Sequence, residues 1–122
     1  FTFIEDGIDG LMKILVNENG CADGQIFNLG NPAADLSIRE LAHRLLEAVG
    51  TYERFAPLAR GAQIVEVSSA EYYGANYQDI TTRVPSIRKA KECLGWEPAT
   101  DFSTGLGKTL DFYLSGRTTP EV

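Results

Sequence analysis

The chain has 122 residues, 43% of them hydrophobic and 23% charged, which is typical of an ordinary soluble globular domain. Its 17 acidic and 11 basic residues give a net charge of −6, and no segment is rich in Lys and Arg. Surfaces that bind nucleic acid or anionic membranes are basic, so we expect no nucleic-acid partner.

No apolar run is long enough for a membrane-spanning helix, which needs roughly 20 residues, and the N-terminus has no signal-peptide pattern. We therefore expect a cytoplasmic protein without membrane insertion. Residue 1 is Phe rather than Met, so we expect residues 1–122 to be one domain of a longer chain. Cys21 and Cys93 have neither a CxxC spacing nor a neighbouring His, which favours free buried thiols over a metal site.

Apolar residues at helical spacing predict a first helix that Asp6 caps and Gly20 ends. Its expected core stripe is Ile8, Leu11, Met12, Leu15 and Val16. A second helix follows a capping box of Ser37 and Glu40 and ends at Gly50. Its expected core stripe is Ile38, Leu41, Ala42, Leu45 and Val49, with His43 on the opposite, solvated face.

A third helix is predicted over residues 87–94, ended by Gly95. Ser103 is expected to cap a fourth helix. On that helix one shared apolar face is expected, made of Leu106, Leu110, Tyr113 and Leu114.

Two short segments read as strands, 25–29 (QIFNL) and 63–67 (QIVEV). The first precedes a Gly-Asn-Pro turn signal, and the second alternates apolar and polar residues. Helices alternating with strands predict a small α/β unit. Between 68 and 82 the chain has no periodicity but carries Tyr72, Tyr73 and Tyr77. This segment fits either a ligand-contacting loop or a surface loop whose tyrosines cover apolar atoms.

Several catalytic patterns are absent from the sequence. No GxGxxG opens a helix, no P-loop is present, no Tyr-x-x-x-Lys spacing occurs, and the single His cannot complete a catalytic triad. The adjacent carboxylates of Glu5 and Asp6 lie at a predicted helix N-terminus, where the helix dipole favours negative charge, so acid/base chemistry is not needed to explain them. Taken alone, the chain is at most a binding module.

Three stretches follow one another along the chain, FTFIEDGIDGLMKIL, IFNLGNPAADLSIRELA and RVPSIRKAKECLGWEPATDFSTGLGKTLDFYL. In order and spacing they resemble the C-terminal, sugar-nucleotide-binding part of extended short-chain dehydrogenases/reductases, the NAD-dependent epimerase/dehydratase family. The segment SSAEYYGANYQDITTRVPSIRKA is most similar to the UDP-glucuronic acid decarboxylase domains of bifunctional polymyxin-resistance proteins. UDP-xylose and UDP-apiose synthases share the Arg-x-Pro and Leu-Gly-Trp-x-Pro elements but have different loops.

The resemblance implies a substrate-binding role for Tyr77 and a catalytic role for Arg83, which aligns with an arginine proposed as proton donor. The implied chemistry is NAD-dependent oxidation of UDP-glucuronate, loss of carbon dioxide and release of a UDP-4-keto-pentose, in the pathway that adds aminoarabinose to lipid A. A fixed guanidinium suits the binding of a carboxylate or an enolate better than proton donation. Without the resemblance, a structural salt bridge to a nearby acid such as Asp79 is the preferred explanation of Arg83.

The family's glycine fingerprint, its Tyr and Lys pair and its NAD site all fall upstream of residue 1, so we expect NAD to be bound by the missing N-terminal half and this chain alone to be inactive. A UDP-sugar is the expected partner of the parent, which we expect to be a homo-oligomer. Two alternatives stay open: another nucleotide-sugar epimerase/dehydratase or a UDP-xylose or UDP-apiose-type synthase, and a non-enzymatic binding domain.

Overall fold

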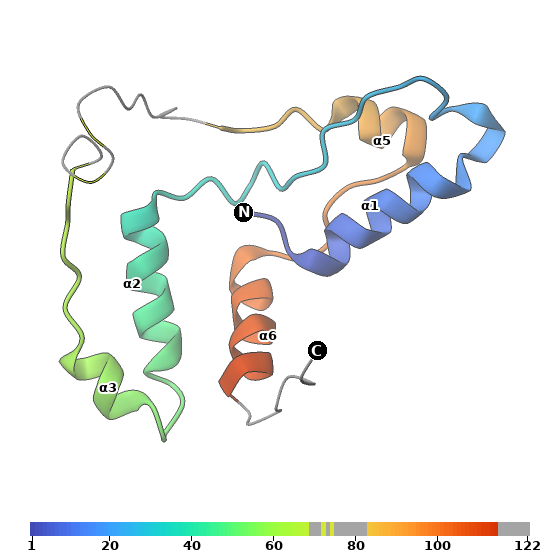
Figure 1. Cartoon of the computed structure of the whole chain (residues 1–122). Helices are drawn as coiled ribbons and strands as arrows, with labels where there is room; N and C mark the ends of the chain where they lie inside the picture. Colours follow the sequence, from blue (N-terminus) through green and yellow to red (C-terminus); the bar gives the residue numbers. More distant parts are fainter. Residues whose placement is uncertain (69–71, 73, 75–82, 115–122) are drawn as a thin grey trace. The chain divides into compact units, whose positions relative to one another are not determined.

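The protein is described from a computed structural model, in which residues 1–68, 72, 74 and 83–114 are described (Figure 1). The chain divides into two compact units, one formed by Phe1–Leu36 with Val84–Val122 and the other by Ser37–Arg83. Each unit is treated by itself below.

The described ranges are helical and contain no strand, so the two strand predictions are wrong. Residues 25–29 and 63–67 have no strand pairing, and Ile26 and Val65 are 85% and 79% exposed. Alternation of apolar and polar residues predicts an extended backbone, but a strand also needs a neighbour that pairs with its N–H and C=O groups. No such neighbour lies in the described part of the chain, so the predicted α/β class is not confirmed.

Helix α1 (Ile4–Val16) begins earlier than predicted. Its N-cap is Phe3, which has no capping side chain, and Asp6 lies inside the first turn. The helix ends because Asn17 takes a left-handed conformation with φ 49° and donates its N–H to the carbonyl of Lys13. Gly20 ends the short 3-10 helix η1 (Glu18–Gly20) instead of α1.

The buried side of α1 is not the predicted apolar stripe. Asp6 and Gly10 are the buried residues of the helix. All members of the predicted stripe are exposed, by 51% for Ile8, 56% for Leu11, 52% for Met12, 76% for Leu15 and 70% for Val16. Helical periodicity identifies an apolar face but not what that face packs against. Gly10 lets α1 approach Leu29 and Trp96 closely, and this contact turns the apolar stripe outward.

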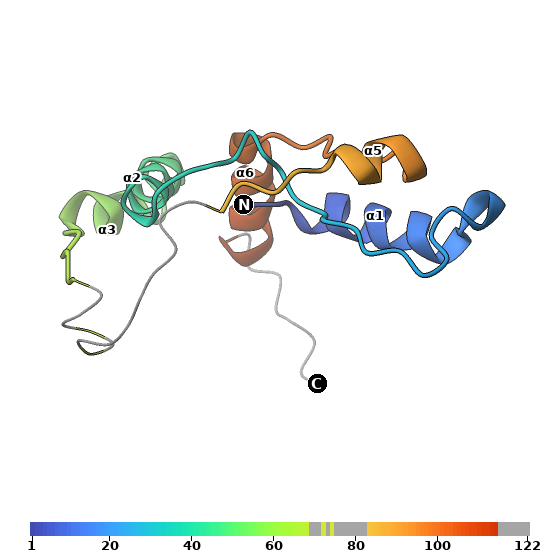
Figure 2. The same cartoon turned by 90° about the horizontal axis from the view of Figure 1, so that it is seen from above.

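The first unit packs around Trp96, which is 1% exposed. Helix α5 (Arg88–Leu94) packs against α1, as both views show (Figures 1 and 2), and it ends as predicted, with Gly95 at φ 59°. Helix α6 (Phe102–Leu114) begins after Asp101 rather than at Ser103. The remaining buried hydrophobic residues of this unit are Ala34, Ala90 and, alone among the predicted face of α6, Leu110.

The second unit contains α2 (Ile38–Val49) and α3 (Ala56–Gly61), which pack together. The predicted N-cap of α2 is confirmed, because the Ser37 hydroxyl accepts a hydrogen bond of 3.1 Å from the Glu40 N–H. Gly50 ends the helix as predicted.

No residue of α2 is buried, so its apolar stripe does not form a closed core within the described residues. Ile38 is 74% exposed, and His43 is exposed as predicted. The prediction of buried thiols is wrong, because Cys21 is half-buried and Cys93 is exposed, although both are free.

Candidate functional site

Arg83, the predicted catalytic residue, has an exposed side chain. Within the described part of the chain it forms neither a hydrogen bond nor an ion pair. Some other cations form ion pairs, such as Arg44 with Glu40 and Lys108 with Glu5, whereas Arg88 resembles Arg83 in having none among the described residues. Among the described residues, the N–H donors of the Arg83 guanidinium therefore have no acceptor.

Tyr77, the predicted substrate-binding residue, lies outside the described residues, and so does Asp79. The structure therefore tests neither a shared site of Tyr77 and Arg83 nor the alternative salt bridge between Arg83 and Asp79.

The segment that follows Arg83 rests on the extended segment 25–31. Pro85 packs directly on Gly30, where a Cβ atom would lie 2.5 Å from the Pro85 Cγ. Asn28 donates a hydrogen bond of 3.5 Å from its side-chain nitrogen to the carbonyl of Ser86. The ammonium of Lys89 lies 5.2 Å from the centre of the Phe27 ring, within the range of a cation–π contact.

These contacts were not predicted from the sequence, where Gly30 counted only as part of a turn signal. A glycine between a strand-like segment and Asn-Pro also fits close approach of another backbone segment. Gly30 was therefore a sequence signal for a close contact, but it does not indicate that the approaching residue is Pro85, far along the chain.

The turn after Gly30 is held by the side chain and backbone of Asn31. Its backbone N–H donates to the Thr2 hydroxyl at 3.0 Å, its side-chain nitrogen donates to the Thr100 carbonyl at 3.2 Å, and its side-chain oxygen accepts from the Ala33 N–H at 3.0 Å. The segment 25–31, on which Pro85 packs, is thus joined by hydrogen bonds to Thr2 and Thr100 of the first unit.

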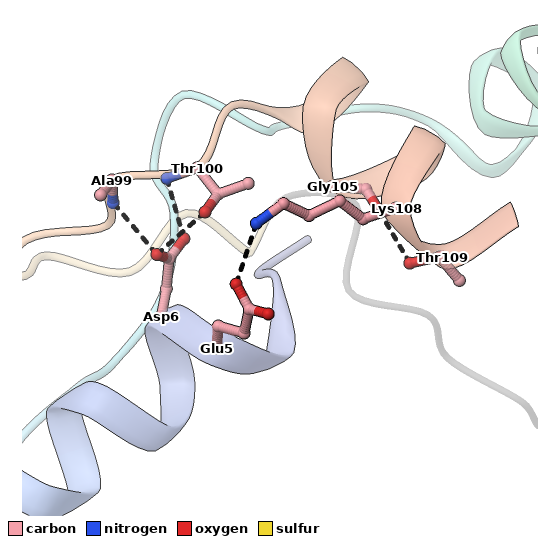
Figure 3. A network of polar contacts seen from close by, with 7 residues as sticks. All are labelled: Glu5, Asp6, Ala99, Thr100, Gly105, Lys108 and Thr109. Carbon is pink, nitrogen blue, oxygen red and sulfur yellow. Dashed lines mark hydrogen bonds and ion pairs between the residues drawn. The ribbon is translucent and has the colours of Figure 1, made fainter. Parts of the chain in front are cut away.

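Asp6 is buried and serves a structural role (Figure 3). Its carboxylate accepts hydrogen bonds from the Ala99 N–H at 3.3 Å and from the N–H and hydroxyl of Thr100 at 3.1 Å each. Its backbone carbonyl accepts from the Trp96 indole at 2.9 Å. The neighbouring Glu5 pairs with Lys108 at 2.9 Å. These partners explain both carboxylates without acid/base catalysis.

An open groove of about 950 Å³ lies between the first residues of the chain and α6. Its lining consists of Thr2, Phe3, Ile4, Glu5, Lys108, Thr109, Asp111, Phe112 and Tyr113. Arg83 is not among these residues. Two of its charged residues, Glu5 and Lys108, form an ion pair, and Lys108 also lies 5.0 Å from the centre of the Phe3 ring.

Among the described residues, no glycine-rich turn joins a strand to a helix N-terminus, the arrangement that holds a pyrophosphate in dinucleotide-binding folds. Among the described residues, no group of three or more His, Cys, Asp or Glu side chains is arranged to hold a metal ion. None of the described helices has the length and hydropathy needed to cross a membrane.

No protein-family model matches the chain. Among solved structures, the chain is similar to the PbgP3 protein from Burkholderia pseudomallei, with a TM-score of 0.80 and 35% sequence identity over 95% of this chain. The match spans 31% of the PbgP3 chain. The chain thus corresponds to about a third of a larger related protein, and the tertiary arrangement is shared along with part of the sequence.

Proposed function

We propose that the protein to which this chain belongs is an NAD-dependent UDP-glucuronate decarboxylase, and that this chain supplies part of its substrate site. The proposal combines the motif resemblance with the similarity to a structure of which the chain spans 31%. It includes an α/β architecture for the parent as a whole, and it assigns NAD to the remainder of the parent.

One observation of this chain carries the proposal. Arg83 is exposed and has no anionic partner among the described residues, and it directly precedes a Val-Pro-Ser segment of the first unit in which Pro85 packs on Gly30. An exposed guanidinium on an anchored backbone suits the recognition of a carboxylate, because its planar fork donates two parallel hydrogen bonds.

The proposed role of Arg83 is electrostatic. Its cation binds and orients the carboxylate of the glucuronate before carbon dioxide leaves, and it stabilises the negative charge that remains on the sugar afterwards. A guanidinium holds its proton over the whole range of ordinary pH, so we assign it no step of proton transfer. Tyr77 would contact the nucleotide portion of the substrate.

The test is release of carbon dioxide from UDP-glucuronate with NAD by the full-length protein and by its Arg83→Ala variant. We expect the variant to lose roughly 100- to 1,000-fold in kcat, the usual effect of removing one preorganised donor, while still binding UDP. Arg88→Ala is the matched control, because Arg88 is also exposed, lies in α5 five positions further along the chain, and its replacement removes the same charge. Its kcat should stay close to that of the wild type.

The outcomes separate the alternatives. If the full-length protein inverts a sugar carbon of its substrate and releases no carbon dioxide, the protein is an epimerase rather than a decarboxylase. An Arg83→Ala variant with unchanged kcat would remove Arg83 from the site. No binding of any UDP-sugar by the full-length protein would favour a non-enzymatic domain.

A further inference from the structure

We infer that Gly30 is a positioning residue for the proposed reaction: by having no side chain, it lets Pro85 seat against the 25–31 segment, and this contact sets the backbone that carries Arg83. The inference rests on the proposed function, since it assumes that Arg83 meets the substrate. It concerns a residue that touches neither substrate nor cofactor.

The contact between Gly30 and Pro85 leaves no space for a side chain. Gly30 is buried, and a Cβ at this position would lie 2.5 Å from the Pro85 Cγ and 3.4 Å from its Cβ. Carbon atoms in contact are normally about 3.5–4.0 Å apart. The proline ring is closed onto its own backbone and cannot rotate away. A Cβ at Gly30 must therefore displace the Pro85 ring or the backbone of one of the two segments.

The neighbouring residues hold the same segment in one register. Ser86 receives the hydrogen bond from Asn28, and Lys89 lies over the ring of Phe27. The pairs 30/85, 28/86 and 27/89 run in opposite directions along the two segments. A shift at Pro85 therefore also disturbs these two neighbouring contacts.

The displacement reaches Arg83 through the covalent chain. Only Val84 separates Arg83 from Pro85, and consecutive Cα atoms are about 3.8 Å apart. A residue that precedes proline is restricted to an extended backbone, so Val84 has little freedom to absorb the change. Bidentate binding of a carboxylate needs both N–H groups in place, and a misplacement of about 1 Å can cost roughly 100-fold in rate.

The experiment compares Gly30→Ala with the wild type in the full-length protein, by carbon dioxide release from UDP-glucuronate. We expect kcat to fall roughly 10- to 100-fold, with the affinity for UDP unchanged. Gly105→Ala is the matched control, because Gly105 is also buried in the first unit and the three atoms nearest to its new Cβ, from 3.2 Å, all belong to Phe3 rather than to the 25–31 segment or Pro85. This control should lower the unfolding temperature and leave kcat near the wild-type value.

A second readout separates positioning from general damage. If Gly30 acts through Arg83, then Gly30→Ala should lower kcat no further in an Arg83→Ala background, because residues that act as a unit are not additive. A purely structural effect would lower kcat by the same factor in both backgrounds, and that result would overturn the inference.

The remaining outcomes are also distinct. A wild type that releases no carbon dioxide refutes the proposed function, whereas an active wild type with an equally active Gly30→Ala variant refutes only this inference. If Gly30→Ala does not fold, Pro85→Ala removes the ring from the same contact. Pro85→Ala should then show the lowered kcat at a nearly unchanged unfolding temperature, and an unchanged kcat would overturn the inference.

Discussion

The carboxylate of Asp6 accepts hydrogen bonds from both the backbone N–H and the hydroxyl of Thr100, each 3.1 Å long, although 94 positions separate the two residues. With the bond from the Trp96 indole to the Asp6 carbonyl, this contact ties α1 to the segment between α5 and α6. The Asp6 carboxylate thus satisfies two backbone N–H groups and a hydroxyl that no helix or strand satisfies.

Replacement of Asp6 by Ala should destabilise the chain by about 2–4 kcal/mol, because partly buried N–H groups lose a charged acceptor. The measurement is urea unfolding followed by the fluorescence of Trp96, the only tryptophan, which is buried beside Asp6. Asp9→Ala is the control, since Asp9 is exposed on the same helix. Equal losses for the two variants would contradict the role given to Asp6.

The two glycines of α1 should respond oppositely to alanine. A Cβ at Gly7 meets nothing within 4 Å, so Gly7→Ala should stabilise the chain by up to about 1 kcal/mol through helix propensity. A Cβ at Gly10 would crowd Leu29 and Trp96, so Gly10→Ala should destabilise it by about 1–2 kcal/mol. Thermal unfolding of both variants measures the difference, and equal shifts would show that α1 does not approach Trp96 closely.

The outward face of α1 can be tested with Leu15, which is 76% exposed. Leu15→Gln should change the free energy of unfolding of the isolated chain by no more than about 0.5 kcal/mol. Leu110→Ala, at a residue 7% exposed, should cost about 2–5 kcal/mol. A large loss for Leu15→Gln would mean that the predicted stripe is the core after all.

The start of α6 should depend on pH. The hydroxyl of Thr104, at 2.6 Å, and then its backbone N–H, at 3.0 Å, donate to the Asp101 carboxylate and hold the pKa of Asp101 below its ordinary value of 3.8. Because this pKa is lowered in the folded chain, the stabilisation is complete above pH 3.8 and is lost as the pH falls below 3.8 toward the folded pKa.

Circular dichroism of the chain between neutral and strongly acidic pH measures this effect. Asp101→Asn keeps a side chain that can cap the helix but does not titrate, so its acid loss of helicity should be smaller than that of the wild type. Identical acid profiles would show that Asp101 does not contribute.

Local signals in the sequence were sufficient for much of the helical structure. The hydroxyl of Ser37 caps the start of α2 and the left-handed Gly95 ends α5, both as predicted. Sequence can predict such caps because a cap depends on atoms within one turn of the chain. Ser103 was the wrong cap for α6, since Asp101 two residues earlier supplies the stronger acceptor. Arg83 could be named only through the family resemblance, and its lack of a partner among the described residues is a structural finding.

The sequence by itself predicted helices α1, α2, α5 and α6 and the ends of α2 and α5, because those outcomes follow from neighbouring residues, but it did not predict α3. Only the tertiary structure decided that Asp6 and Gly10, rather than the apolar stripe, face inward on α1, that segments 25–29 and 63–67 lack strand partners within the described residues, and that Gly30 receives Pro85. Each of these depends on contacts between residues far apart in the chain, and a local pattern does not specify which distant segment completes it.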